Sequence, residues 1–164
     1  MSDKEIQRAI DKYLLGRHEL IQLARKHPDL IGGNDNMIGR IGEFIALRFL
    51  ERLGQRPRKV EGKSNPGYDL VDDEVKTQVK VITEENEKGR TVRLTDPWTQ
   101  LLIIELGKRY KPRRVGLLTK AQHLRARTEN VGWSEYPIIK RSMLGPKGLI
   151  HRYGRVYEGD ELGI

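Results

Sequence analysis

The chain has 164 residues and no cysteine, so it can bury the core of one domain but can form neither a disulfide framework nor a thiolate metal site. Its 31 Lys and Arg residues against 23 Asp and Glu residues give a net charge of +8, which favours an anionic partner such as nucleic acid. The sequence contains no long apolar run and no signal-like N-terminus, so we expect a cytoplasmic protein without membrane contact.

The first predicted element is a helical extension over residues 1–30. Ser2 and Glu5 have the spacing of a capping box, in which each side chain bonds the backbone amide of the other residue. Apolar residues at helical spacing follow, and the pattern stops before Pro28, because the residue that precedes a proline disfavours helical backbone angles. We expect this helix to serve dimerisation or nucleic-acid contact.

A second helix is predicted from Asn36 to Leu53. Asp35 or Asn36 can supply its N-cap, and Gly54 follows as its C-terminal stop. The apolar residues recur at the spacing of one helical face, at Ile38, Ile41, Phe44, Ile45, Phe49 and Leu53.

Glu43 lies within the first two turns of this helix and is a candidate site residue. Its neighbours Gly39, Gly42 and Ala46 are small, and small side chains allow a helix to approach a sheet closely. The Glu43 carboxylate could then reach a site at the ends of the strands. The alternative is an exposed Glu43 that pairs with Arg40, three positions back.

A hairpin is predicted next, with strands from Tyr68 to Val71 and from Val75 to Val81. In the second strand β-branched residues recur at every second position, which indicates one buried face. Asp72-Asp73 is the expected turn, because Asp tolerates the backbone angles that a turn requires.

Three polar side chains of the hairpin could act together. With the turn at Asp72-Asp73, Asp69 lies opposite Lys76, and Gln78 and Lys80 follow on that face. Residues on the same face of a strand are roughly 7 Å apart, from a rise of about 3.3 Å per residue. Asp69 and Gln78 could therefore share one divalent cation, with Lys80 just beyond it. A register shift of one residue would destroy this arrangement.

Glu74-Val75-Lys76 is a second candidate with the same spacing of polar side chains. Asp69 and Glu74 are separated by only four residues, and Glu74 begins at the turn. We therefore favour Gln78 and Lys80.

The later elements complete an α/β pattern. Leu101 to Leu106 is apolar except for Glu105, which is typical of a buried central strand. Val115 to Thr119 is a further short strand, and Lys120 to Glu129 is predicted to be a helix. The segment 146–153 could be a DNA-contacting extension or an edge hairpin that closes the core.

Basic residues concentrate in the C-terminal half. Residues 106–155 hold 13 Lys and Arg against two acidic residues, whereas residues 60–105 hold 6 against 10. We divide the single domain into the helical extension 1–30, a core at 37–130 and a basic extension at 131–164. This charge distribution suits an acidic cation site within a surface that binds phosphates, and the alternative is a solvated basic loop. The candidate nucleic-acid-binding residues are Arg40, Lys108, Arg109, Lys111, Arg113, Arg114, Lys147 and Arg152.

Two other kinds of site are not expected. The segment Ile31-Gly32-Gly33-Asn34 is not followed by Gly-Lys-Ser/Thr, so we expect no phosphate-binding loop and no nucleotide cofactor. Zinc-ligand spacing is absent among the four histidines, which are His18, His27, His123 and His151.

Glu43 on a helix, then Gly67-Tyr68-Asp69, then Gln78-Val79-Lys80, resembles the PD-(D/E)xK nuclease superfamily. This superfamily includes many restriction endonucleases, Holliday junction resolvases and DNA repair nucleases. The resemblance covers residues 37–119 and implies a restriction-endonuclease-like α/β core, with a mixed four- to five-stranded sheet flanked by helices. The chain departs from the commonest pattern at Pro66, three residues before Asp69, and at Gln78, where Asp or Glu is usual. Branches that resemble the Mrr-type restriction nucleases also carry Gln there.

The resemblance implies a Mg²⁺ site, with Mn²⁺ as a substitute, held by Glu43, Asp69, Gln78 and the carbonyl of Val79. Magnesium prefers oxygen ligands and acidifies a bound water. Lys80 would orient or deprotonate the attacking water, so the catalytic residues would be Glu43, Asp69, Gln78 and Lys80.

Two hypotheses follow from these residues. The first is a Mg²⁺-dependent DNA endonuclease of the restriction, homing or junction-cleaving type, acting as a homodimer because one site cuts one strand. The second is a catalytically inactive DNA-binding or structural protein that keeps the nuclease fold. Gln78, which replaces a carboxylate, is the main reason to consider the second.

Overall fold

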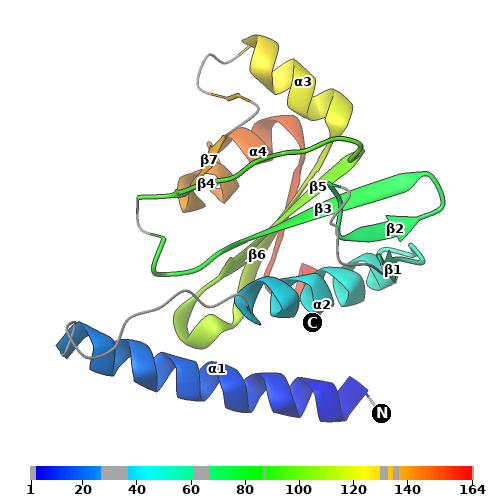
Figure 1. Ribbon diagram of the computed structural model, residues 1–164. Helices are drawn as coiled ribbons and strands as arrows, with labels where there is room; N and C mark the ends of the chain where they lie inside the picture. The colour runs from blue at the N-terminus through cyan, green and yellow to red at the C-terminus, as the bar shows by residue number, and fades with distance from the viewer. Residues whose placement is uncertain are drawn as a thin grey trace.

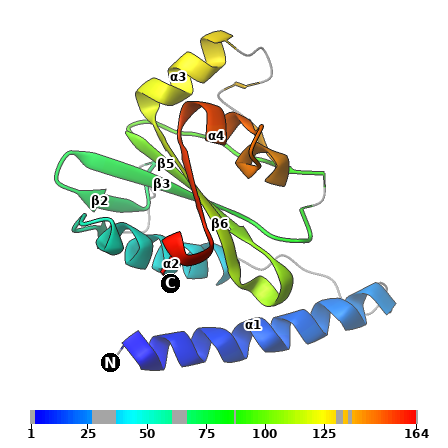
Figure 2. The same cartoon turned by 180° about the vertical axis from the view of Figure 1, so that it is seen from behind.

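The computed structural model describes residues 3–26, 37–60, 67–86, 88–129, 133–134 and 137–163. They form an α/β fold in which helices flank a mixed sheet, as expected (Figure 1). The helix α1 (Asp3–Lys26) runs along the bottom of the fold in both views, next to α2 (Met37–Arg52) (Figure 2).

Within the described residues the main sheet has six strands, which in spatial order are β1 (Arg58–Lys59), β2 (Leu70–Asp72), β3 (Val75–Ile82), β5 (Gln100–Leu106), β6 (Pro112–Thr119) and β8 (Arg155–Glu158). Among the described strands of this sheet, only β3 and β5 run parallel, and every other neighbouring pair is antiparallel. The expected count of four to five strands is too low. Strands β1 and β8 were missed because two to four residues do not show a readable alternation. A separate two-stranded sheet pairs β4 (Arg90–Thr91) with β7 (Ile138–Ile139).

The predicted helices are confirmed. Helix α3 (Lys120–Glu129) has the expected bounds, and α1 is one continuous helix. Helix α2 ends in a Schellman motif, in which Gly54 N–H donates to Glu51 O at 2.9 Å and Gln55 N–H to Leu50 O at 3.1 Å. The expected N-capping residues lie outside the described residues, as does Pro28.

Two apolar clusters cover the two faces of the sheet. The first lies between α2 and the sheet and includes Phe49, Val79, Val81 and Leu102. The second lies on the opposite face, beneath α3 and α4 (Leu149–Tyr153). Its buried members are Ile82, Val92, Trp98, Leu101, Ile103, Leu118, Trp133, Ile139, Leu144 and Ile150.

The predicted hairpin exists, but its predicted register is wrong. Asp72 pairs with Val75, so the turn consists of Asp73 and Glu74, and Val71 rather than Asp69 lies opposite Lys76. The Asp72 carboxylate accepts a bond from the Arg56 amide at 2.9 Å, which holds Asp72 in the strand. Asp73 takes the left-handed conformation (φ 48°), which Asp tolerates better than most residues.

The C-terminal segment contributes to the sheet. Strand β8 pairs antiparallel with β6 at the sheet edge, and α4 packs on β6. Residues 149–153 therefore form a helix and not the expected edge hairpin, and the edge strand follows this helix at residues 155–158.

A polar network attaches α1 to the body. Arg17 donates two bonds to the Glu85 carboxylate, at 2.8 and 2.9 Å, and also donates to the Tyr110 hydroxyl, which in turn donates to Glu85. Tyr110 ends the 3₁₀ turn η1 (Lys108–Tyr110), which follows β5. Burial and the neighbouring Glu85 charge raise the pKa of Tyr110, so its hydroxyl stays protonated and remains a donor.

Candidate active site

Successive side chains of strand β3 point alternately to the two faces of the sheet. Val79 and Val81 face α2, where an added Cβ at Gly42 would overlap with the Val81 side chain. Gln78 and Lys80 therefore face the opposite side, together with Ile82 of the second apolar cluster. The sequence prediction that Gln78 and Lys80 share a face is confirmed by this alternation.

Asp69 is fixed against the middle of the Gln78-Val79-Lys80 segment. Its Oδ2 accepts a hydrogen bond from the Val79 amide at 2.7 Å, and its own amide donates to Thr77 O at 2.8 Å. Although the predicted register is wrong, the structure thus brings Asp69 beside Gln78 and Lys80. The correct register places Asp69 nearer to Gln78 than the predicted one did, because Leu70 pairs with Thr77.

The loop that carries Asp69 is set by Gly67. Gly67 has φ 92°, and an added Cβ would overlap with Thr95 O and lie 2.7 Å from Asp96 O. Only glycine combines this conformation with such a close approach of two backbone segments. The Gly67-Tyr68-Asp69 loop is therefore packed directly against the chain that precedes β5.

Gln78 carries the most unusual polar atom of the site. The residue is 4 % exposed, and its Oε1 has no hydrogen-bond partner among the described residues. Leaving a buried acceptor unsatisfied costs about 1–3 kcal/mol. An amide oxygen is a suitable ligand for a hard cation such as Mg²⁺. The orphaned Gln78 oxygen beside the Asp69 carboxylate therefore fits a divalent cation.

Lys80 lies in a partly desolvated position. Burial lowers the pKa of its amine, the charge of Arg90 on β4 lowers it further, and the charge of Asp69 opposes both. A lysine with a lowered pKa is neutral more often than a surface lysine, so it can accept a proton from water.

Glu43 lies on the other face of the sheet from Gln78. Its Oε2 is 2.6 Å from Lys59 Nζ on β1, so its partner is Lys59 and not Arg40. Lys59 pairs in register with Leu70, the residue after Asp69. The structure therefore brings Glu43 close to strand β2 but does not bring its carboxylate to the face that carries Gln78 and Lys80.

No group of three or more His, Cys, Asp and Glu side chains with metal-binding geometry occurs within the described part of the chain. A cation held here would rely on Asp69 together with amide and backbone oxygens, which are not carboxylates. Gln78 is itself neutral, so it would add no charge to such a site.

The second candidate pair, Glu74 and Lys76, lies nearer to the turn of the hairpin than Asp69 does. Glu74 is exposed in the turn, and Lys76 lies over the Tyr68 ring with its Nζ 5.6 Å from the ring centroid. Gln78 and Lys80 flank Val79, whose amide bonds Asp69, so they lie closer to Asp69 along the hairpin than Glu74 and Lys76 do.

The basic residues around η1 lie far from the hairpin site. Gln78 pairs with Leu101, and β5 continues for five more residues to Leu106 before η1 begins, which corresponds to roughly 17 Å along the strand. Arg114 differs from its neighbours, because it is 14 % exposed and its Nε lies 2.6 Å from the buried Glu105 carboxylate. The exposed residues of the predicted set are Arg40, Lys108, Arg109, Lys111, Arg113, Lys147 and Arg152.

Sequence reasoning missed two cations, Arg90, whose charge acts on Lys80, and Lys59, which pairs with Glu43 on the other face of the sheet. Lys59 and Arg90 come from strands of two residues, and neither contact has a local signal, because each arises from strand pairing and chain crossing. Tyr68, which packs against the second apolar cluster, was part of the motif but was given no role.

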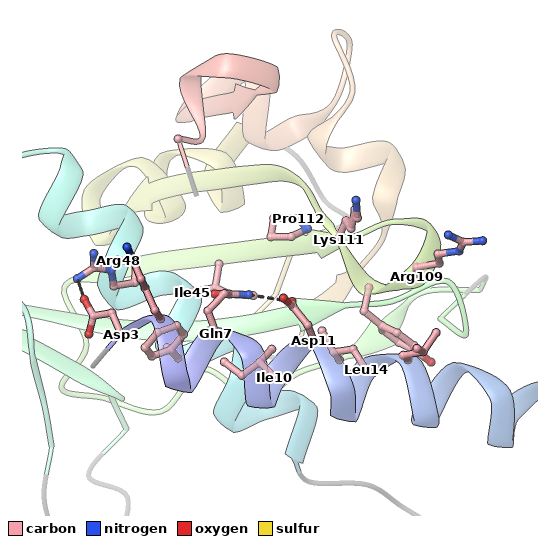
Figure 3. A pocket seen from close by; sticks show the side chains of 15 residues that line it. Asp3, Gln7, Ile10, Asp11, Leu14, Ile45, Arg48, Arg109, Lys111 and Pro112 are labelled. Atoms are coloured by element: carbon pink, nitrogen blue, oxygen red, sulfur yellow. Dashed lines mark hydrogen bonds and ion pairs between the residues drawn. The ribbon is translucent and has the colours of Figure 1, made fainter. Parts of the chain in front are cut away.

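A cavity of ≈ 730 Å³ lies elsewhere, between α1, α2 and the chain around η1 (Figure 3). Its lining is mixed in charge: Arg48 is 2.7 Å from Asp3, the neutral Gln7 donates to Asp11 at 3.0 Å, and Lys4, Arg109 and Lys111 also line the cavity. None of the hairpin residues of the candidate site lines it. We therefore assign the chemistry to the hairpin and not to this cavity.

Across the described ranges, no helix combines the length and apolar character needed to cross a bilayer. The sequence matches no protein-family model, and no curated protein is similar to it. A functional assignment must therefore be argued from the site itself.

Proposed function

We propose that this protein is a metal-dependent endodeoxyribonuclease, a phosphodiester hydrolase with its active site on the β2–β3 hairpin. The observation that carries the proposal is the buried Gln78 Oε1, which lacks a hydrogen-bond partner in the described structure. Beside it are Asp69, anchored on the Val79 amide, and Lys80 with its lowered pKa. Oxygen ligands and a proton-accepting amine are the groups that hydrolysis of a phosphodiester with Mg²⁺ requires.

Each residue of the hairpin has a separate task in this proposal. Asp69 and Gln78 hold Mg²⁺, or Mn²⁺ in its place, and the Val79 carbonyl is the further ligand implied by the resemblance to PD-(D/E)xK nucleases. When bound, the cation acidifies a water and neutralises charge on the phosphate. Lys80 orients the attacking water and accepts its proton, and the resulting ammonium faces the negative charge of the transition state.

Glu43 has a less direct role in the proposed mechanism than the hairpin residues. Its ion pair with Lys59 ties α2 to β1, and Lys59 neighbours β2 at Leu70. We therefore expect substitution of Glu43 to reduce activity less than substitution of Asp69. An equal loss of activity on substitution of Glu43 and of Asp69 would indicate that Glu43 is a direct metal ligand.

The second candidate function is DNA binding without turnover. The observations that favour it are the neutral Gln78 and the lack of a three-carboxylate group within the described residues. DNA binding that weakens with salt, without cleavage in any metal, is the result that this function predicts.

The decisive experiment is cleavage of supercoiled, linear and branched DNA with Mg²⁺, Mn²⁺ or a chelator. Asp69→Asn should abolish cleavage, whereas Glu74→Gln, a matched change in the exposed turn of the same hairpin, should leave it intact. Loss of cleavage in Glu74→Gln alone would indicate that Glu74 and Lys76 form the active site. Cleavage that survives in Asp69→Asn would show that this hairpin does not form the active site.

A further inference from the structure

The outer side of helix α1 is exposed and partly apolar. On its inner side Leu14 is buried in the core and Arg17 is paired with Glu85, whereas its outer side faces away from the rest of the fold (Figures 1 and 2). Three of the seven exposed large hydrophobic side chains among the described residues belong to α1. Two of these three, Leu20 and Leu23, are 54 % and 45 % exposed on the outer side. Removing such side chains from water is favourable, so a partner that covered them would bind.

These two leucines continue a row of small residues. With 3.6 residues per turn, Leu23 lies directly opposite the buried Leu14, and Ala9, Gly16 and Leu20 lie within roughly 60° of Leu23 around the helix. An added Cβ at Gly16 would meet no atom within 4 Å, so a second backbone can come close to the helix there. We call Ala9, Gly16, Leu20 and Leu23 the outer stripe.

A row of charged residues runs beside the outer stripe. Glu5, Lys12, Glu19 and Lys26 recur every seven residues, so they lie in one row along the helix, and all four are exposed. Their signs alternate, so the row as a whole carries no net charge. A neutral row does not favour phosphates, which argues against nucleic-acid contact on this side of α1.

This charged row is complementary to itself when it is reversed. If a second α1 runs antiparallel, with a two-fold axis between Leu15 and Gly16, Lys12 faces Glu19 of the second copy and Glu5 faces its Lys26. In a parallel pair the two rows lie on opposite edges of the interface, so none of these ion pairs forms. Charges that flank an apolar seam set the orientation of paired helices, so the row selects the antiparallel arrangement.

We propose that the outer stripe binds the outer stripe of a second copy of this chain, so that two α1 helices pair antiparallel in a two-fold homodimer. A surface that is complementary to itself across a two-fold axis is the property of an interface between identical chains. The two bodies do not collide, because each lies on the inner side of its own α1 (Figures 1 and 2). The inference does not rest on the proposed nuclease function, since no residue of the stripe or of the charged row belongs to the hairpin.

Sedimentation equilibrium of the full-length chain without DNA tests the apolar part of the interface. Leu20→Gln/Leu23→Gln keeps the helix propensity and should weaken self-association at least about 10-fold. Leu15→Gln is the matched control, because Leu15 is 55 % exposed but lies on the side of α1 that borders the cavity, and it should leave self-association unchanged. A parent chain that stays monomeric at every concentration, or equal weakening by the control, would overturn the proposal.

Charge reversal at low salt tests the orientation. Lys12→Glu or Glu19→Lys alone turns two attractive pairs into two repulsive pairs and should weaken self-association about 4- to 30-fold. The double variant Lys12→Glu/Glu19→Lys, and an equimolar mixture of the two single variants, should recover the affinity of the parent. Lys4→Glu makes the same change beside the cavity and should have no effect. Failure of the double variant to recover would overturn the antiparallel arrangement.

Single cysteines locate the two-fold axis, because the chain has no cysteine of its own. Gly16→Cys, next to the axis, should form a disulfide between two copies under mild oxidation. Ala9→Cys should form none, because an antiparallel pair separates the two copies of residue 9 by roughly 20 Å along the helices, beyond the reach of a disulfide. Efficient cross-linking of Ala9→Cys, or none of Gly16→Cys, would overturn the proposal.

Discussion

The contact between α2 and β3 positions the proposed site, and Gly42 tests it. An added Cβ at Gly42 would overlap with Val81 Cγ2, whereas its next neighbours, Val81 Cβ and Val79 Cγ1, are 3.6 and 4.0 Å away. The conflict in Gly42→Ala is therefore with one methyl group of a buried, β-branched side chain that has little freedom to rotate. Gly39→Ala is the control, because an added Cβ there meets no atom within 4 Å.

The two substitutions share one favourable effect and differ in one unfavourable effect. Replacing Gly by Ala inside a helix stabilises it by about 1 kcal/mol, which is the full effect expected for Gly39→Ala. Overpacking a close-packed interior costs about 1–3 kcal/mol, so Gly42→Ala should be neutral to about 2 kcal/mol less stable than the parent. At 164 residues, each kcal/mol corresponds to roughly 2–4 °C in Tm.

Urea denaturation of the two variants measures the free energy of unfolding directly, with thermal unfolding as a second readout. The double variant Gly42→Ala/Val81→Ala, which lacks the offending methyl group, should show a coupling energy of about 0.5–3 kcal/mol relative to the sum of the single variants. If Gly42→Ala stabilises the protein as much as Gly39→Ala does, α2 does not lie on β3 as described.

Three further predictions concern the site and its surroundings. Gln78→Leu removes the buried oxygen that lacks a partner, so the variant should lose activity. In chelator it should be as stable as the parent or up to about 2 kcal/mol more stable. A large loss of stability would mean that the oxygen has a partner. In metal-free protein the pKa of Lys80 should lie below that of exposed lysines. Asp69→Asn should lower this pKa further, because the negative charge of Asp69 raises it. An NMR titration of the Lys80 side chain that showed a higher pKa in Asp69→Asn would contradict this prediction. Arg114→Ala leaves the buried Glu105 carboxylate of β5 without its main partner, so it should lower the free energy of unfolding by about 3–5 kcal/mol in chemical denaturation. Arg113→Ala changes a 64 % exposed side chain and should lower the free energy of unfolding by less than about 1 kcal/mol. Equal losses of stability in the two variants would refute the argument from burial.

Elements with strong local signals were predictable from the sequence. The apolar spacing of α2 and α3, the alternation of β3 and the continuous apolar run of β5 all appear in the structure where the sequence placed them. The same holds for the pairing of Gln78 and Lys80 on one face, because alternation along a strand does not depend on the partner strand.

Features that depend on distant parts of the chain were not predictable. The turn moved by one residue because Asp72 is held in the strand by the Arg56 amide, a contact across sixteen positions. Strands β1 and β8 are too short to leave a pattern, and the lowering of the Lys80 pKa by the Arg90 charge depends on how the β3–β5 connection is folded. The face on which Glu43 lies follows from how α2 packs, which its helical periodicity alone does not fix.

Metal-dependent cleavage by a lysine variant tests the central claim most directly. Lys80→Met keeps the length of the side chain and removes its amine, and Lys88→Met makes the same change at an exposed lysine beyond the end of β3. We predict that Lys80→Met abolishes Mg²⁺-dependent cleavage of whichever DNA substrate the parent cuts, and that Lys88→Met cleaves at the rate of the parent. Full activity in Lys80→Met would contradict the assignment of the active site to this hairpin.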